Sequence, residues 1–163
     1  MVGTSVETDV ETRITDDDHQ SLRLWLRLLA CTNLIQNRIR QELQANFDTT
    51  LPRFDLMAQL DREPEGLKMG ELSKRLMVTG GNVTGITDLL EQEGFVVREA
   101  DPGDRRSFRV KLTKEGRRHF RKMAVQHEQW IQEVFEGLSG RQKDQLAGLL
   151  GALKGHAGEW SAS

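Results

Sequence analysis

Apolar residues recur three and four positions apart along most of the chain, and this spacing predicts helices rather than strands. Four predicted helices cover residues 19–47, 51–62, 69–76 and 82–93. A fifth begins after Thr113, with an apolar stripe that runs to Phe135, and a sixth begins after Ser139, with a stripe that ends at Leu153. Thr50, Thr113 and Ser139 are placed to cap the helices that follow them. We therefore expect a mainly helical protein.

Polar and apolar positions alternate in only one region. Residues 93–99 and 107–112 each have the composition of a strand, and Pro102-Gly103 lies between them. Two strand patterns joined by a Pro-Gly segment predict a β-hairpin. Just before it, the helices 69–76 and 82–93 are joined by a few residues only, as in a helix-turn-helix. The predicted fold class is mainly α (α+β), a winged helix-turn-helix whose hairpin carries arginines at its tip.

The first predicted helix has two apolar stripes instead of one. They consist of Leu22, Trp25, Leu26 and Leu29 and of Leu24, Leu28, Cys31, Ile35 and Ile39. One stripe is sufficient to pack a helix on the core of its own chain. The second stripe indicates that another subunit covers this helix.

The charge of the chain is unevenly distributed. Its net charge is −2, but residues 66–121 hold 12 Lys and Arg against 8 Asp and Glu. A local basic excess over the predicted helix and hairpin is what a DNA-contacting surface requires. Residues 1–18 are acidic and polar and are expected to form a disordered arm. No window is long and apolar enough for a membrane span, no secretory signal is present, and one cysteine fits a reducing compartment, so we expect a cytoplasmic protein.

The sequence contains no pattern that is typical of an enzyme or of a metal site. Paired Cys/His spacings, a glycine-rich phosphate loop and a nucleophile elbow are all missing from it. His119 and His127 lie two helical turns apart, too far for a joint ligand pair. We expect no catalysis, no cofactor and no metal ion.

Five short blocks resemble the MarR family of bacterial transcription regulators, over about residues 22–155. They are Leu51-Pro52-x-Phe54, Leu72-Ser73 with Gly80-Gly81-Asn82-Val83-Thr84, Leu90-Glu91-x-x-Gly94, Asp101-x-x-Asp104-Arg105-Arg106 and Val110-x-Leu112-Thr113-x-Glu115-Gly116. The resemblance implies an obligate homodimer that binds a palindromic DNA operator. It assigns residues 19–50 and 114–158 to dimerisation and residues 51–113 to the winged domain.

The resemblance also implies which residues contact DNA. At the second helix of the motif they are Thr79, Gly81, Asn82, Thr84 and Thr87. In the hairpin, Arg106 is expected to enter the minor groove while Asp104 holds its guanidinium, and Arg105 is expected to contact phosphate. The chain has Gly85 where many members carry an arginine, so its operator cannot be inferred by analogy.

In the family, small ligands bind where the dimer helices meet the winged domain and alter the spacing of the recognition helices. The corresponding residues here are Trp25, Arg27, Leu29, Asn33, Arg53, Phe54 and Met57. An aromatic ring and a guanidinium in one place favour a small organic anion, such as an aromatic acid or its coenzyme A thioester. We expect a ligand-responsive regulator, and a repressor in particular.

Two alternatives stay open at this point. A winged helix can serve as a protein-interaction module without a DNA target, although the wing arginines argue against that use. Cys31 can act as a redox sensor, as a cysteine of the first helix does in some members. Its place on an apolar stripe and the lack of any tyrosine favour instead a buried thiol with a raised pKa.

Overall fold

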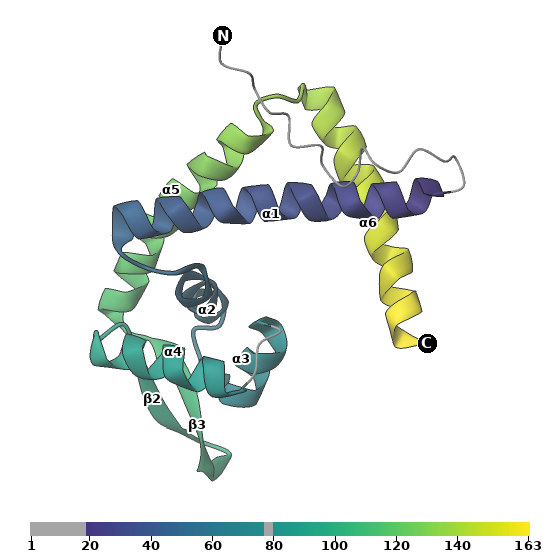
Figure 1. Ribbon diagram of the computed structural model, residues 1–163. Coiled ribbons are helices and arrows are strands. Elements are labelled where there is room, and N and C mark those ends of the chain that lie inside the picture. Colours follow the sequence, from purple (N-terminus) through teal and green to yellow (C-terminus); the bar gives the residue numbers. More distant parts are fainter. Residues whose placement is uncertain (1–18, 77–79) are drawn as a thin grey trace.

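The computed structural model describes residues 19–76 and 80–163 and confirms the mainly helical fold with a small sheet. Within these residues the elements follow one another as shown in Figure 1. They are α1 (Gln20–Phe47), α2 (Leu51–Asp61), β1 (Leu67–Lys68), α3 (Met69–Leu76), α4 (Gly80–Gln92), β2 (Val96–Asp101), β3 (Asp104–Leu112), α5 (Lys114–Phe135) and α6 (Gly140–Ala162). The predicted helices and the predicted hairpin are all present, with ends that differ by a few residues.

Three of the helices begin at the caps that the sequence predicts. The side chain of Thr50 accepts a hydrogen bond from the backbone N–H of Arg53, and Thr113 accepts one from Gly116. Ser139 and Gln142 form a reciprocal capping box at the start of α6. These contacts satisfy N–H groups that have no partner inside a helix. A cap at Asp17 or Asp18 for α1, and one at Thr79 for α4, lie outside the described residues.

The sheet has three antiparallel strands in the order β1-β3-β2. Val96 pairs with Leu112 and Asp101 with Asp104, so β2 and β3 form the hairpin, with an irregularity between Ala100 and Asp101. The two-residue strand β1 pairs with β3 on its other side. Our sequence analysis did not predict β1, because two residues are too few to show a period of alternation.

One apolar core lies between the helices and the sheet of the winged domain. Fully buried side chains come from α2, α3, α4, β2, β3 and α5, and they include Leu56, Leu60, Leu72, Val83, Leu90, Val96, Val110 and Met123. Only the C-terminal half of α1 contributes to it, through Ile39 and Leu43. The core therefore holds the winged domain and one end of α1 together.

The start of α5 is fastened to the backbone where β2 begins. The N–H of Thr113 donates to the carbonyl of Phe95, and the hydroxyl of Thr113 donates to the carbonyl of Gly94, at 2.7 Å. Gly94 has φ +78°, which suits a glycine at the end of α4. Gly116 lies so close to this segment that a Cβ atom there would be 1.9 Å from the carbonyl oxygen of Phe95. Only glycine permits this approach.

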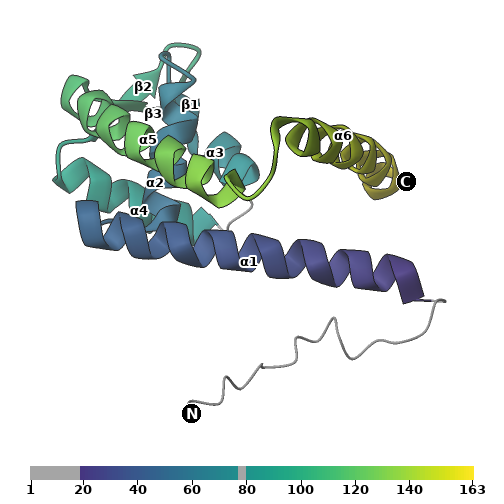
Figure 2. The ribbon, with the colours of Figure 1, turned by 90° about the horizontal axis from the view of Figure 1, so that it is seen from above.

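The N-terminal half of α1 and all of α6 extend away from the winged domain. Figure 2 shows α6 lying apart from α1, although the two cross in the view of Figure 1. No residue of α6 is buried in the described chain, and Leu149 and Trp160 are 71% and 76% exposed. None of the described helices is long and apolar enough to cross a bilayer. These two segments therefore present apolar side chains that the chain itself does not cover.

The contact between Gly116 and Phe95 generates a stability prediction. Gly116→Ala should lower the free energy of unfolding by about 3 kcal/mol or more, because the new methyl group has no space beside the backbone. Gly85→Ala is the matched control, since nothing lies within 4 Å of a Cβ atom there. Alanine should stabilise α4 at that position by about 0.5–1 kcal/mol. Chemical denaturation measures both, and equal stability of the two variants would contradict the assignment.

Candidate nucleic-acid interface

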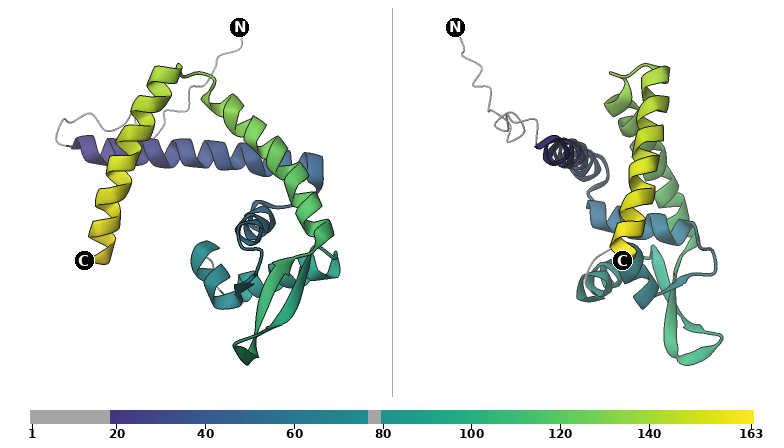
Figure 3. Two further views of the ribbon diagram at one scale, coloured as in Figure 1. Left: turned by 180° about the vertical axis from the view of Figure 1, so that it is seen from behind. Right: turned by 90° about the vertical axis from the view of Figure 1, so that its right-hand side faces the viewer.

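The helix α4 and the hairpin β2–β3 lie at the same end of the molecule, remote from α6 (Figure 1). In the views of Figure 3 the hairpin projects beyond the helices of the winged domain. An exposed helix beside a projecting hairpin is the geometry that allows contact with one groove of DNA and with the adjacent backbone or groove. These two elements form the candidate interface.

The N-terminal half of α4 exposes part of the predicted contact set. The side chains of Asn82 and Thr84 are exposed, and Gly85 beside them leaves open space on the helix surface. Amide and hydroxyl groups in such positions can bond base edges or phosphates. Thr79 lies outside the described residues, as do the surroundings of Gly81 at the helix start. The roles of all four remain predictions.

Thr87 requires a correction, because its side chain points into the protein. It is fully buried, and its hydroxyl donates to the carbonyl of Val83, one turn earlier, at 2.7 Å. The same hydroxyl lies 3.9 Å from the sulfur of Met69 on α3. A threonine satisfied in this way packs α3 against α4 and cannot reach a groove. Its polar side chain misled the sequence-based assignment, because threonine is equally suited to a surface and to this internal bond.

The C-terminal half of α4 is fixed to the sheet by ion pairs. Arg98 on β2 pairs with Asp88 and with Glu91, which lie one turn apart on α4. The guanidinium is therefore shared between two carboxylates and acts as a clamp. This clamp fixes the orientation of α4 relative to the hairpin, so both parts of the interface move together.

Asp101, at the end of β2, organises the base of the hairpin turn. Its carboxylate is 6% exposed and lies 2.9 Å from the Lys68 ammonium of β1 and 3.3 Å from Nε of Arg109 on β3. It also accepts hydrogen bonds from the N–H of Gly103 and the hydroxyl of Ser107. One side chain thus joins all three strands and the turn.

The partners of Asp101 stabilise its ionised form. The hydrogen bond from Lys68, with those from Gly103 and Arg109, holds the pKa of this carboxyl well below its usual range. Arg109 is fixed from a second side, because its guanidinium also donates to the carbonyl of Gly66 at 3.2 Å. At neutral pH the charged carboxylate of Asp101 therefore holds the three strands together at the base of the hairpin turn.

The predicted bond from Asp104 to the guanidinium of Arg106 requires a second correction. Asp104 Oδ1 instead accepts a hydrogen bond from the backbone N–H of Arg106, at 3.0 Å. No ion pair is recorded between these two side chains, both of which belong to the described part of the hairpin. Asp104 orders the turn, and the exposed side chains of Arg105 and Arg106 extend from it. Our sequence analysis gave no role to Asp101, because its contact with Lys68 becomes visible only once β1 is placed next to β3.

Several basic residues of the winged domain are committed to internal ion pairs. Arg75 pairs with Glu63, and Lys111 with Glu99, in addition to the pairs of Lys68, Arg98 and Arg109 described above. Arg105 and Arg106 have no recorded side-chain partner in the described chain. The unpaired positive charge of the hairpin is therefore concentrated at its tip, where contact with a phosphate backbone is possible.

The predicted ligand residues do not form one pocket in the single chain. Phe54 and Met57 are buried in the core, where the Phe54 ring lies against Phe120 and His127. Arg53 pairs with Glu93 at the end of α4. The remaining four are all exposed on α1: Trp25, Arg27, Leu29 and Asn33. An effector site built from this set remains a prediction that requires a second chain next to α1.

Cys31 differs from the expectation of a buried thiol. It is a free cysteine, and its side chain is exposed on the surface of α1 in the single chain. The apolar stripe on which it lies packs on the core of the winged domain only at its C-terminal end, through Ile35 and Ile39. Among residues 19–76 and 80–163, no three His, Cys, Asp or Glu side chains are placed to hold a metal ion.

Comparison with known proteins agrees with this geometry. A model of the MarR family matches residues 49–108, from the cap of α2 to the middle of β3. The HTH-type transcriptional regulator YkoM of Bacillus subtilis (strain 168) is 36% identical over 122 residues, which are 74% of this chain and 77% of that protein. The chain belongs to the MarR family.

Two further comparisons extend over most of the chain. The HTH-type transcriptional repressor YetL of the same organism is 31% identical over 83% of this chain and 81% of its own length. The crystal structure of AbsC, a MarR family transcriptional regulator from Streptomyces coelicolor, is 26% identical, with a TM-score of 0.75 over 93% of this chain and 100% of that one. The protein is thus a transcription regulator with a winged-helix DNA-binding domain, and not an enzyme.

The buried carboxylate of Asp101 generates a prediction on pH. Its pKa in the folded protein lies below the ordinary value of about 3.9, so the carboxylate favours folding above about pH 4. That contribution is lost as the pH falls further towards the folded pKa. Asp101→Asn should lower the Tm at neutral pH by several degrees, and it should lose less of its remaining stability on acidification than the wild type does.

Asp104→Asn is the control for this measurement. Asp104 is exposed and accepts one backbone hydrogen bond, which an asparagine oxygen can also accept. Its Tm at neutral pH should remain close to that of the wild type. If thermal denaturation shows that both substitutions have equal effects, the hairpin is not organised around Asp101.

Proposed function

We propose that the protein binds a palindromic DNA operator as a homodimer, represses transcription from it, and is released by a small organic anion. The observation that carries the DNA-binding part is the pairing of an exposed α4 surface with an arginine-tipped hairpin, clamped together by Arg98. Positions held rigidly before binding lose less entropy when the complex forms.

For DNA recognition, α4 is placed in the major groove. Asn82 and Thr84 then face base edges or phosphates, while Arg106 reaches the minor groove and Arg105 a phosphate. The hydrogen bonds of Asp104 and Asp101 within the turn support this role, because they fix the backbone from which the side chains of Arg105 and Arg106 extend. Gly85 allows the backbone of α4 to come close to the DNA.

The uncovered apolar side chains support a homodimer. They lie on α1 and α6 and include Leu22, Leu24, Trp25, Leu34, Leu149, Leu153 and Trp160. A soluble monomer rarely exposes so many large apolar groups. A second copy that covers them creates a twofold axis, and two winged domains related by that axis match a palindromic site. The same interface covers the exposed face of α1 that carries Cys31.

Release by a ligand requires that the ligand prefer the dimer conformation that does not fit the operator. About 100-fold preference, close to 2.7 kcal/mol, is enough to move most of the dimers into that conformation. YetL is named a repressor, which supports the same direction of control here. An aromatic carboxylate or its coenzyme A thioester fits the mixture of aromatic and arginine side chains on α1 and α2 that includes Trp25, Arg27 and Arg53.

Operator binding is tested with DNA from the protein's own upstream region. The affinity should fall by about 10³ or more between 50 and 200 mM salt if roughly six phosphates are neutralised. Arg106→Ala should weaken binding by about 1–3 kcal/mol, or about 5- to 150-fold, without changing the Tm. Lys154→Ala on α6, which removes one exposed charge far from the hairpin, is the control. Binding that is insensitive to salt and to Arg106→Ala would refute the proposal.

Dimerisation is tested on α6. The double substitution Leu149→Glu with Leu153→Glu should convert the protein to monomers at micromolar concentration, because charges would be buried without partners. Gln145→Glu on the same helix adds charge at an exposed polar position and should leave the dimer intact. Analytical ultracentrifugation gives the result, and a wild type that is monomeric at high concentration would exclude this interface.

A further inference from the structure

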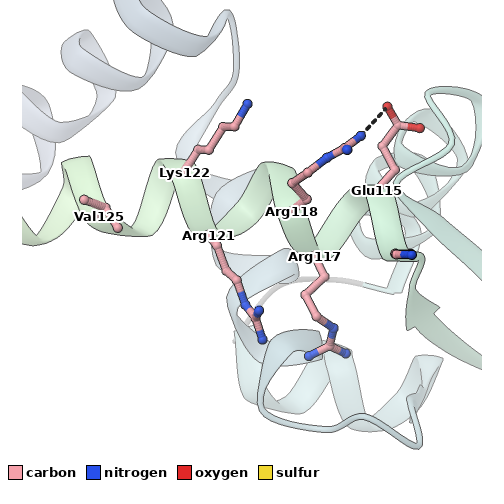
Figure 4. A pocket seen from close by; sticks show the side chains of 7 residues that line it. Glu115, Arg117, Arg118, Arg121, Lys122 and Val125 are labelled. Carbon is pink, nitrogen blue, oxygen red and sulfur yellow. Dashed lines mark ion pairs between the residues drawn. The ribbon is translucent and has the colours of Figure 1, made fainter.

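The outer face of α5 carries a basic cluster that the DNA-binding surface does not use. Lys114, Arg117, Arg118, Arg121 and Lys122 lie within nine residues on the first turns of the helix and line an open cavity of about 790 Å³ (Figure 4). Figure 4 shows Arg118 and Lys122 extending to one side of the helix and Arg117 and Arg121 to the other, with Val125 one turn further along. Five cations on so short a segment produce a strongly positive local potential.

Only part of this charge is neutralised inside the protein. Arg117 lies 3.2 Å from Asp61 on α2, and Arg118 lies 3.8 Å from Glu115. Within the described residues, no ion pair is recorded for Lys114, Arg121 or Lys122. Like charges three and four positions apart on a helix repel one another. An anion bound among them would remove this repulsion.

The cluster continues into a second hollow whose lining has only one charged residue, Lys122. This hollow has a volume of about 490 Å³ and is lined by Asn46 and Phe47 at the end of α1 and by Lys122, Val125 and Gln126 of α5. Lys122 and Val125 belong to both hollows. A ligand with an anionic group and an aromatic or apolar body therefore finds matching surfaces side by side.

The cluster lies at the opposite end of the hairpin from Arg105 and Arg106. α5 begins after Thr113, immediately beyond the end of β3, whereas the two arginines lie at the start of that nine-residue strand. At about 3.3 Å per residue, the two sites are roughly 25 Å apart. DNA held by α4 and the hairpin tip does not need this face, which leaves it available to another anion.

From this arrangement we propose that the outer face of α5 is a binding site for a small anion that carries at least two negative charges and an aromatic or apolar group. Arg121, Lys122 and Arg118 hold the charged end, and the body lies along Val125 and Phe47. The site differs from the α1–α2 residues named for the effector above, and only its regulatory effect rests on the proposed operator binding.

Ring contacts connect this site to the C-terminal end of α4. Phe47 makes an edge contact with His119 of α5 at 6.3 Å, and His119 stacks on Phe95 at 4.4 Å. Burial holds the pKa of His119 below its ordinary value, so its ring is neutral at pH 7 and can lie flat on a phenyl ring. Phe95 follows Gly94 at the end of α4. A ligand that displaces Phe47 or α5 therefore acts on the position of α4.

Binding is tested with phenyl phosphate, which has both the dianionic and the aromatic part. Calorimetry on the full chain in about 0.1 M salt, where charges are screened over about 10 Å, should show saturable binding. Inorganic phosphate should bind about tenfold more weakly, because it lacks the ring. The double variant Arg121→Gln with Lys122→Gln should also lose about tenfold or more in affinity for phenyl phosphate. Its Tm should be equal to or above that of the wild type, because repulsion within α5 is relieved.

The matched control removes the same charge elsewhere, through Arg62→Gln with Lys154→Gln. Its affinity for phenyl phosphate should remain within about twofold of the wild type. A measurement on the unmodified protein is independent of any variant: phenyl phosphate should protect Lys114 and Lys122, but not Lys154, from amine acetylation followed by mass spectrometry. Equal loss of binding in both double variants, or no protection of these lysines, would overturn the site.

The regulatory effect is tested on the complex with operator DNA. Phenyl phosphate should release the operator from the wild type and should fail to do so from the Arg121→Gln, Lys122→Gln variant. If that variant instead binds long operator fragments more weakly in the absence of phenyl phosphate, the face contacts DNA and the proposal is wrong. If the wild type binds no operator at all, the proposed function fails, while calorimetry and lysine protection still decide on the site.

Discussion

The backbone contact between Gly116 and Phe95 holds the start of α5 against the segment that connects α4 to β2. At this point Gly94 and Phe95, which connect α4 to β2, accept hydrogen bonds from Thr113 at the start of α5. Because the contact is between backbone atoms, no change of rotamer can relax it. A rotation of α5 must therefore be transmitted to α4, which is the mechanical requirement for any regulator that controls DNA from a distant site.

The hairpin depends on a different kind of constraint, a buried charge. Asp101 satisfies Lys68 and Arg109, and each of these belongs to another strand. A network of this type is stable only when every member has partners, and it then fixes one geometry. The wing therefore gains its shape from a carboxylate and not from an apolar core, which a two-stranded projection is too thin to have.

The fold was accessible from the sequence to the extent that its signals are local. Helix periods, the caps at Thr50, Thr113 and Ser139, and the Pro-Gly turn each lie within a few residues, and the structure confirms all of them. The strand β1 pairs with residues about 41 to 43 positions away, and its Lys68 lies about 33 positions from Asp101, so no local pattern reports these contacts. Thr87 was misassigned for a related reason. Whether a threonine of α4 faces the solvent or the protein interior depends on where α3 packs against α4, and the local sequence does not show that. The exposed apolar side chains of α1 and α6 have no cover within the described residues.

The internal pairing of basic residues has a consequence for how the protein searches DNA. Lys68, Arg75, Arg98, Arg109 and Lys111 are bound to carboxylates of the same chain, so few cations near the hairpin are available for phosphates in general. Non-specific affinity rises with each phosphate that is neutralised, whereas base contacts contribute only at the correct site. A hairpin whose unpaired charge is restricted to Arg105 and Arg106 adds little to the affinity for unrelated DNA. Discrimination between a target and unrelated DNA would therefore depend more on the fit of α4 to the base sequence than on general attraction to phosphates.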